Sequence, residues 1–195
     1  MQRLVLASNN AKKLKELGTL LAPIGIELVP QGALNIPEAE EPYLTFVENA
    51  LAKARHASRL SGLPAIADDS GLCVRALGGA PGVLSARFAG EPKSDERNNR
   101  LLLEKLAGQQ DRAAHFVSLL VLVRHADDPQ PIITEGNWHG EILETPRGEH
   151  GFGYDPLFWV PEANLSAAEM TAEAKNQCSH RAIAMQQLLT RLGTL

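Results

Sequence analysis

Aromatic residues and positive charge are both scarce in this sequence. Aromatic side chains make up 5% of its 195 residues, and the formal net charge is −4. Proteins that bind single-stranded nucleic acid use aromatic side chains as stacking platforms, and nucleic-acid binders in general carry an excess of basic residues. The composition therefore argues against a nucleic-acid partner, although a single nucleotide would need only a few local cations.

Long apolar runs and paired cysteines are also missing. No apolar stretch is long enough to span a bilayer, and the first residues lead into a strand-like segment without a signal-peptide pattern. The two cysteines, Cys73 and Cys178, share no metal-ligand spacing, so we expect two unpaired thiols in a reducing compartment. The sequence predicts a soluble cytoplasmic protein without a membrane partner.

The remaining composition is that of a globular protein. Hydrophobic residues make up 44% of the chain, and its length is ample for a buried core. The apolar spacing predicts a strand over Arg3–Ser8, a helix over Asn10–Ala22 and a strand over Ile26–Val29. Thr45 and Glu48 form a capping box, which begins another helix.

Strands dominate the middle of the chain. We expect, in order, a strand over Pro64–Ala67 that stops at Asp68, a strand over Leu72–Leu77, a helix capped by Ser94 that ends near Gly108, a central strand over Phe116–Arg124, a turn at Asp127–Pro129, a hairpin of two antiparallel strands within Ile132–Glu144, a loop over 145–156, a second capping box over Ser166–Glu169 and a helix over Ser179–Leu192. This order predicts an α/β fold with a mixed central sheet flanked by helices, in one domain over residues 1–195.

The first candidate site is the turn from strand to helix at Ser8–Lys13. The free backbone N–H groups and positive dipole end of a helix N-terminus suit a phosphate, and Lys13 can add a point charge. A capped surface helix with solvated lysines is the other interpretation. On this segment alone that interpretation is favoured, because the glycine-rich phosphate loop is missing.

Carboxylates form the second candidate site. Asp68 and Asp69 follow an apolar strand, and hard divalent cations such as Mg²⁺ are often held by one or two carboxylates. An Asp-rich turn that satisfies its own backbone is equally compatible with the pattern. The acidic loop with Glu38, Glu40 and Glu41 precedes a helix that carries Lys53. Neither the loop nor Lys53 is specific in isolation.

Two segments near the C-terminus suit a nucleobase. Phe152 stands between two glycines, which would let a ligand approach closely, and Asp155 can accept hydrogen bonds from base N–H groups. A glycine-rich loop with its aromatic residues packed inward is the alternative. His180 and Arg181 begin the last helix, where cations oppose the helix dipole, so an anion or a carbonyl ligand would explain them.

In order along the chain, the motifs are SNNxxK, EE before TFxENAxxKA, IADDSGL, GGAPGxxSARF, GFGYDPxF and K…SHR. Taken together, this series resembles the inosine triphosphate pyrophosphatase family, also called the non-canonical purine nucleoside triphosphate pyrophosphatases. The resemblance extends from Ser8 to Arg181. The sequence departs from the family pattern at Asn9, where the family commonly has glycine in a Thr-Gly-Asn motif.

The resemblance implies a fold, an activity and a cofactor. The fold would have two lobes with the active-site cleft between them, and the enzyme would be a homodimer. It would use Mg²⁺ to hydrolyse inosine, deoxyinosine or xanthosine triphosphate to the monophosphate and pyrophosphate. Asp69 would be the catalytic residue and a metal ligand, with Asp68, Glu41 and Glu40 as further ligands. The substrate-binding residues would be Ser8, Asn9, Asn10, Ala11, Lys12, Lys13, Lys53, Ser70, Phe152, Gly153, Tyr154, Asp155, Lys175, His180 and Arg181.

Hydrogen-bond polarity gives a reason for the implied base preference. Arg181 and His180 can donate to the 6-oxo group of hypoxanthine or xanthine, whereas adenine presents an amino donor there. Two alternatives stay open. One is a related pyrophosphatase for other modified nucleotides, which the Ser-His-Arg segment disfavours. The other is a nucleotide sensor without turnover, which would not need the Asp68–Asp69 pair.

Overall fold

The computed structural model describes the backbone of residues 2–193 and all of their side chains except those of Gln2, Lys12, Glu16 and Leu20. The chain divides into two compact units, each built from separated segments. Unit 1 contains Met1–Asp69, Ser118–Glu135 and Ala184–Leu195, and unit 2 contains Ser70–Val117 and Gly136–Ile183. Three long strands pass from one unit into the other, because the division falls within β3, β4 and β5.

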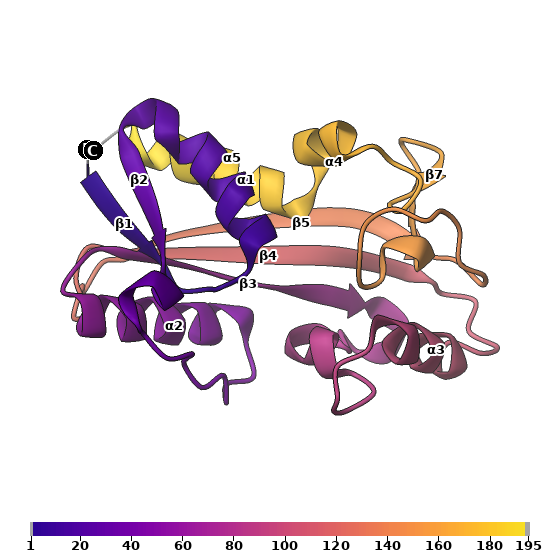
Figure 1. The fold of residues 1–195 in the computed structure, drawn as a ribbon. Coiled ribbons are helices and arrows are strands. Elements are labelled where there is room, and N and C mark those ends of the chain that lie inside the picture. Colours follow the sequence, from indigo (N-terminus) through magenta and orange to yellow (C-terminus); the bar gives the residue numbers. More distant parts are fainter. Residues whose placement is uncertain (1, 194–195) are drawn as a thin grey trace. The chain divides into compact units, whose positions relative to one another are not determined.

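Within the described residues, the strands form a seven-stranded sheet in the order β2-β1-β3-β4-β5-β6-β7 (Figure 1). Their bounds are β1 Gln2–Leu6, β2 Ile26–Pro30, β3 Ala65–Val74, β4 Ala113–Val123, β5 Ile132–Ile142, β6 Phe158–Val160 and β7 Leu165–Ser166. β1 pairs in parallel with β2 and β3, whereas β6 pairs antiparallel with β5 and β7. The predicted α/β fold with a mixed sheet flanked by helices is confirmed, and β4 is its central strand.

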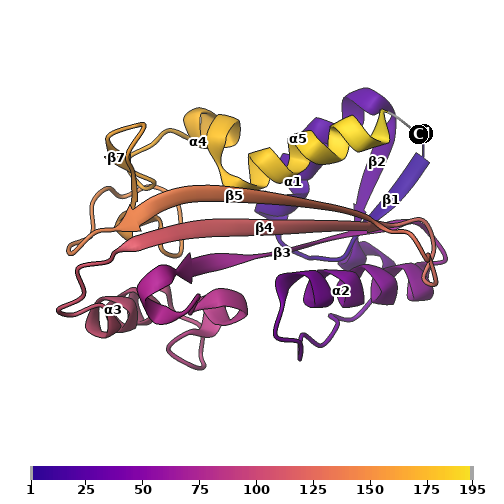
Figure 2. The same ribbon diagram turned by 180° about the vertical axis from the view of Figure 1, so that it is seen from behind.

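Unit 1 has a hydrophobic core of its own. Helix α1, Ala11–Leu21, and the end of helix α5, His180–Leu192, cover one face of the strands, and helix α2, Phe46–Ser61, covers the other (Figures 1 and 2). Leu17 of α1 and Leu188 of α5 are fully buried against the strands. On the opposite face, the apolar residues that α2 buries are all alanines, Ala50, Ala54 and Ala57, and small side chains let a helix backbone approach a sheet closely.

Helix α2 begins at the predicted capping box. Thr45 accepts a hydrogen bond from the Glu48 N–H, and Gly62 ends the helix with φ of 69°. The second half of the capping box differs from the expected form. The Glu48 carboxylate accepts from the Thr45 hydroxyl at 2.5 Å. Both forms fix the first turn of the helix.

Unit 2 has a second core. Leu102 and Leu106, at the end of helix α3, Asp95–Lys105, pack with strand residues such as Phe116, Trp138 and Phe158. Ser94 caps α3 as predicted by accepting from the Arg97 N–H. Helix α4, Ala172–Cys178, and the short 3₁₀ turn Asp155–Leu157 complete the unit beside the Gly-rich loop.

The interruption predicted at Asp68–Gly71 is wrong. β3 continues through this segment as one strand, Ala65–Val74, and 3₁₀ turn Arg75–Leu77 replaces the end of the second predicted strand. Asp68 and Asp69 therefore do not lie at the end of their own strand. They lie just beyond the end of β1, because β1 pairs with β3 only as far as Leu6 and Ile66.

The hairpin predicted within Ile132–Glu144 is also wrong, since β5 is one strand over Ile132–Ile142. Gly140, which suggested a turn, is needed for close packing. A Cβ atom there would collide with the carbonyl oxygen of Trp159 and with the ring of Phe158. Glycine inside a strand often marks such a close approach.

The predicted capping box over Ser166–Glu169 is present, but it begins no helix. Ser166 and Glu169 exchange hydrogen bonds, with the Ser166 N–H donating to Glu169 Oε2 at 2.7 Å and the Glu169 N–H to Ser166 Oγ at 3.2 Å. A turn follows, and α4 begins later, with Thr171 as its own cap.

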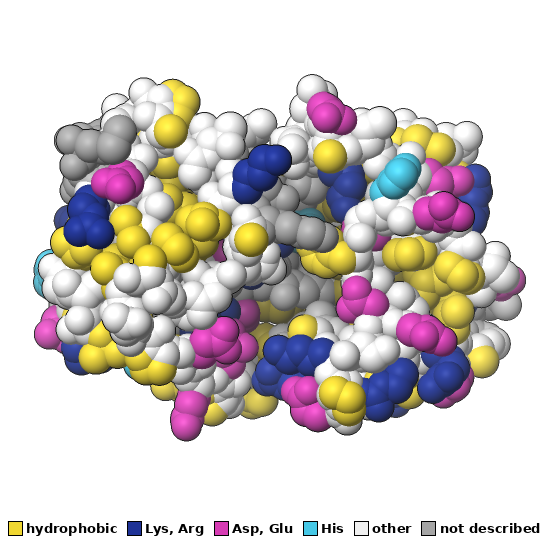
Figure 3. Space-filling model, viewed as in Figure 1, with side chains coloured by type: hydrophobic (Ala, Val, Ile, Leu, Met, Phe, Trp, Pro, Cys, Tyr) yellow, Lys and Arg dark blue, Asp and Glu magenta, His cyan; other side chains and the backbone are white. Residues whose placement is uncertain are grey.

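Surface composition agrees with the sequence analysis. Acidic and basic side chains are interspersed over the face drawn in Figure 3. Cys73 and Cys178 are both free thiols, as expected. In the part of the chain that the structure describes, none of the helices combines the length and the apolar character required to cross a membrane.

Candidate active site

Ser8–Lys13 contains the turn after β1 and the first residues of α1, in unit 1. Ser8 Oγ accepts from the Asn10 N–H at 3.1 Å, and Asn10 Oδ1 accepts from the Lys13 N–H at 3.3 Å. The segment therefore caps the helix, as the simpler interpretation required. It also leaves a helix N-terminus without an acidic residue in its first turn. Ala11 begins the helix, and the side chain of Lys12 lies outside the described residues.

Asn9 has a specific role at the position where the family commonly has glycine. Its Oδ1 accepts from the Gly32 N–H at 2.8 Å, and a Cβ atom on Gly32 would lie 2.5 Å from that oxygen. Among the described non-glycine residues, only Asn35 and Asn164 have positive φ. A left-handed backbone therefore does not explain Asn9, whereas the hydrogen bond that connects Ser8–Lys13 to the Gln31–Leu34 turn does.

Asp68 is a buried carboxylate with two partners from unit 1. Lys13 Nζ lies 2.5 Å from its Oδ2, and Ser118 Oγ donates to its Oδ1 at 2.8 Å. A buried charge is stable only when it is paired and hydrogen-bonded. Ser118 was not predicted as a site residue. The one hint in the sequence is that it is the only polar side chain between Phe116 and Val123.

Asp69 and Glu41 converge on Lys53. The Lys53 ammonium lies 2.8 Å from Asp69 Oδ1 and 2.6 Å from Glu41 Oε1, and it also donates to the Asp68 carbonyl at 3.0 Å. Only 12% of the Lys53 side chain is exposed. The structure thus brings together three predicted residues that the sequence places far apart, around one buried positive charge.

Burial perturbs the ionisation of this cluster. Burial raises the pKa of Asp69, and the nearby carboxylates of Glu41 and Asp68 add to the rise, although Lys53 opposes it. Burial alone would lower the pKa of Lys53, but its bonds with Asp69 and Glu41 outweigh that effect and raise it. Lys53 therefore stays charged, and Asp69 is a stronger base than a solvent-exposed aspartate.

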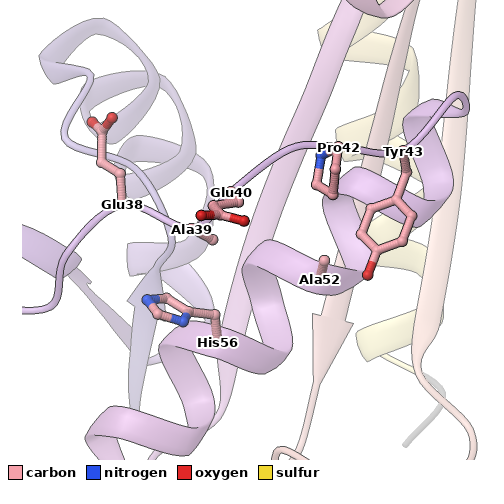
Figure 4. A pocket seen from close by; sticks show the side chains of 7 residues that line it. All are labelled: Glu38, Ala39, Glu40, Pro42, Tyr43, Ala52 and His56. Atoms are coloured by element: carbon pink, nitrogen blue, oxygen red, sulfur yellow. The ribbon is translucent and has the colours of Figure 1, made fainter.

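Glu40 and Glu38 line a hollow of about 450 Å³ against α2, together with Tyr43 and His56 (Figure 4). In the described part of the chain, no three His, Cys, Asp or Glu side chains are arranged to hold a metal ion. The ligand set Asp69, Asp68, Glu41 and Glu40 stays a prediction. Of these, Asp69 and Glu41 are the two that share a cation in the structure.

The Gly-rich loop of unit 2 is organised around Asp155. This buried carboxylate accepts from Lys175 Nζ at 2.6 Å and from the Phe152 N–H at 3.0 Å. A Cβ atom on Gly151 would collide with the same carboxylate, and Gly151 has φ of 82°. Asp155 therefore shapes the loop, in addition to any contact that it makes with a base.

Phe152 lies at the surface of the loop. Half of its surface is exposed, and Lys175 Nζ lies 5.8 Å from the centre of its ring. Tyr154 points inward, where its hydroxyl donates to the Ser85 carbonyl at 2.8 Å and burial raises its pKa. The inward-packed alternative thus applies to Tyr154, while Phe152 offers an accessible ring.

Helix α3 holds the loop at Gly153. Asp95 Oδ2 accepts from the Gly153 N–H at 2.7 Å, and Asn99 Nδ2 donates to the Gly153 carbonyl at 2.8 Å. Both side chains lie on one face of α3, four residues apart. No local sequence pattern indicates these contacts, because more than 50 residues separate each of the two side chains from Gly153.

His180 and Arg181 begin α5 and are both half-buried. The His180 ring stacks on Phe116, with 5.0 Å between ring centres and 16° between planes, and also on Trp138. This packing fixes the imidazole plane. Ser70 follows Asp69 on β3 and is half-buried as well.

Comparisons with known proteins agree on one family. The model of the Ham1 family matches residues 4–191. A protein named dITP/XTP pyrophosphatase from Aromatoleum aromaticum is 70% identical over 192 residues, covering 98% of this chain and 97% of its own. One of the same name from Ralstonia nicotianae is 64% identical over 195 residues, with 98% and 97% covered. The solved structure of a HAM1 protein from Coxiella burnetii is 47% identical, with a TM-score of 0.97 and complete coverage of both chains.

Proposed function

This chain belongs to the Ham1 family, and on that basis we propose that it hydrolyses non-canonical purine nucleoside triphosphates, namely inosine, deoxyinosine and xanthosine triphosphate. The products are the nucleoside monophosphate and pyrophosphate, so the reaction removes these nucleotides from the pool. The observation that carries the proposal is the convergence of Asp69 and Glu41 on the buried Lys53 in unit 1. With a divalent cation on its two carboxylates, this cluster suits a substrate with several phosphate charges.

The N-terminus of α1 and nearby lysines bind the phosphates of the substrate. The positive end of the α1 dipole at Ser8–Ala11 and the ammonium groups of Lys12, Lys13 and Lys53 supply positive charge, and Ser70 binds nearby along β3. Lys13 is held on Asp68 at 2.5 Å, so its ammonium is already positioned beside the helix start. A preorganised charge loses less entropy on binding than a free lysine would.

Magnesium is the proposed cofactor, with Asp69 and Glu41 as principal ligands and Asp68 and Glu40 as further candidates. The donor set fits, because Mg²⁺ prefers oxygen ligands and two of these carboxylates already share one cation in Lys53. When bound, the ion polarises a phosphoryl oxygen and neutralises developing charge.

Asp69 performs the proton transfer. It accepts a proton from the attacking water, whose oxygen forms a bond to the α-phosphorus while the bond from that phosphorus to the bridging oxygen breaks. Pyrophosphate leaves with the electron pair of that bond. The raised pKa of Asp69 suits it to this task, since a base gains strength as its pKa approaches the working pH.

Unit 2 supplies the base-binding residues. Phe152 offers an exposed ring for stacking, Gly153 and Tyr154 complete the loop, and Lys175 and Asp155 fix it in place. His180 and Arg181 donate to the 6-oxo group. The stacked His180 ring supports this role, because it cannot rotate freely away from a ligand.

The remaining proposals concern organisation. Residues 1–195 act as a single pyrophosphatase domain, and the enzyme is a homodimer, as the family resemblance implies. We place it in the cytoplasm, where free thiols such as Cys73 and Cys178 persist.

A substrate panel with Mg²⁺ tests the function. Inosine, xanthosine, adenosine and guanosine triphosphates are supplied, and pyrophosphate and orthophosphate are measured separately. We expect pyrophosphate from the first two at rates well above those of the last two. Orthophosphate as the direct product would refute attack at the α-phosphorus, and equal rates on all four would refute the base preference.

A further inference from the structure

Residues 37–43 form a short acidic segment, here called the acidic strap, that carries Glu38, Glu40 and Glu41. It has no helix or strand of its own and runs beside α2 (Figure 4). Since its backbone makes no ladder with a strand, other contacts must fix its position.

Two side chains of α2 bind the backbone at the two ends of the strap. Asn49 Oδ1 accepts from the Tyr43 N–H at 3.1 Å, and Asn49 Nδ2 donates to the Tyr43 carbonyl at 3.1 Å. At the other end, His56 Nε2 lies 2.9 Å from the Pro37 carbonyl oxygen and donates to it. The strap is thereby attached to one helix at both of its ends.

The same helix face carries Lys53. Asn49, Lys53 and His56 are four and three residues apart, which places them on one side of α2. Glu41, two residues from Tyr43, is bound by Lys53 at 2.6 Å. The helix that supplies the cation thus also fixes the segment that delivers Glu41 to it.

Asn49 makes the more demanding of the two end contacts. Only 2% of the residue is exposed, and both ends of its amide are used by the peptide groups of one residue. Two hydrogen bonds to one residue fix its orientation as well as its distance. A buried amide that loses a partner is costly, so the Tyr43 peptide is held tightly.

We infer that Asn49 is a positioning residue for the metal site. It acts through the Tyr43 backbone to hold Glu41 beside Asp69, without touching substrate or metal itself. The inference rests on the proposed function, which makes Glu41 and Asp69 the principal metal ligands. Groups that orient a ligand typically change metal affinity or activity 10–100-fold when they are removed.

The variant Asn49→Asp tests this role. It keeps an acceptor for the Tyr43 N–H but replaces the Nδ2 donor with an oxygen that faces the Tyr43 carbonyl. Asn98→Asp is the matched control, because Asn98 is equally buried at 2% and its amide also binds backbone groups, those of Ala86 and Ala89 in unit 2. Both variants should lower the melting temperature.

The decisive measurement is the Mg²⁺ concentration that gives half-maximal turnover of inosine triphosphate. We expect Asn49→Asp to raise it about tenfold, with kcat at saturating Mg²⁺ much less affected. Asn98→Asp should leave it unchanged. A folded Asn49→Asp protein with the wild-type Mg²⁺ requirement would overturn the inference, and so would an equal rise in the control.

Two further readouts separate this inference from the proposed function. Hydrogen exchange should quicken over residues 38–43 in Asn49→Asp and not in Asn98→Asp. Calorimetric titration with Mn²⁺ measures metal affinity without turnover, so equal Mn²⁺ affinities in wild type and Asn49→Asp would overturn the inference even if wild type released no pyrophosphate. If Asn49→Asp fails to fold, His56→Ala releases the other end of the strap. An unchanged metal affinity in that variant would then overturn the inference.

Discussion

Asp69 is subject to opposing electrostatic effects. Burial and two neighbouring carboxylates raise its pKa, whereas the ammonium of Lys53 favours its charged form. Asp68, the next residue, differs in its surroundings, because its carboxylate is occupied by Lys13 and Ser118. Adjacent aspartates thus have separate partners. Asp68 binds Lys13 and Ser118, whereas Asp69 binds Lys53.

Replacing Asp69 with asparagine should remove the base while keeping the shape of the side chain. We expect kcat for inosine triphosphate to fall by about 10²–10⁴-fold, the usual contribution of a general base. Steady-state pyrophosphate release measures it. Asp127→Asn is the control, since the Asp127 side chain is 88% exposed in the same unit and should leave kcat unchanged. Near-normal turnover by Asp69→Asn would contradict the assignment of Asp69 as the general base.

Arg181 should determine base choice. Arg181→Ala removes a donor to the 6-oxo group, so we expect kcat/KM for inosine triphosphate to fall by about 10–100-fold, equivalent to one charged hydrogen bond of about 1.5–3 kcal/mol. Adenosine triphosphate, which lacks the oxo group, should lose much less. Arg191→Ala at the far end of α5 controls for general effects on the helix. Equal losses on the two substrates would contradict the base-reading role.

At the scale of elements, the turn between β4 and β5 is fixed by Asp128. Its carboxylate accepts from the Arg124 side chain at 2.6 and 2.8 Å, from the Arg124 N–H at 2.9 Å and from the Gln130 N–H at 2.9 Å. The bonds from Arg124 hold the pKa of Asp128 well below its usual range. Because the folded-state pKa is lowered, ionised Asp128 stabilises the fold above the unfolded pKa of about 4, and the effect is lost as pH falls below it.

Asp128→Asn should therefore lower the free energy of unfolding at neutral pH, and the difference from wild type should become smaller in acid. Urea unfolding at about pH 7 and about pH 3 measures the free energy of unfolding of both proteins on either side of the unfolded pKa. Asp111→Asn provides a comparison, as a partly exposed carboxylate that also pairs with an arginine. A difference between wild type and Asp128→Asn that stayed constant over this range would show that ionisation of Asp128 is not responsible.

Helices were predicted correctly where a local sequence pattern fixes their start. The caps at Thr45 and Ser94 fix helix starts through bonds three residues away, so short-range chemistry was sufficient. The predictions for β3 and β5 were wrong because the residues that suggested turns there make contacts with residues far away in the sequence. Lys13 and Ser118 neutralise and bind Asp68 within the strand, and Trp159 packs on Gly140.

The same distinction applies to the candidate site. Motif order along the chain was sufficient to select Asp69, Lys53 and Glu41, which the structure brings together. The sequence did not predict that Asn49 contacts the segment carrying Glu41 or that Ser118 contacts Asp68. Asn49 binds the Tyr43 backbone and Ser118 binds the Asp68 carboxylate, and a local sequence pattern does not predict such contacts.

For the whole molecule, the relevant feature is that two cores share three strands. Leu17 belongs to the core of unit 1 and Leu102 to that of unit 2, and both are fully buried. β3, β4 and β5 each contribute residues to both units. Loss of order in one unit would therefore release one end of three strands that the other unit needs, which favours unfolding in a single transition.

Core mutations read by two probes test this cooperativity. Both tryptophans, Trp138 and Trp159, lie in unit 2, so their fluorescence reports that unit, whereas far-UV circular dichroism reports the whole chain. Leu17→Ala should cost about 2–5 kcal/mol and shift the urea midpoint seen by fluorescence as far as that seen by dichroism. Leu102→Ala, the same change within unit 2, is the matched comparison and should shift both probes together. If Leu17→Ala moved the dichroism midpoint but left the tryptophan midpoint at its wild-type value, the two cores would be separate folding units, and the shared strands would not couple them.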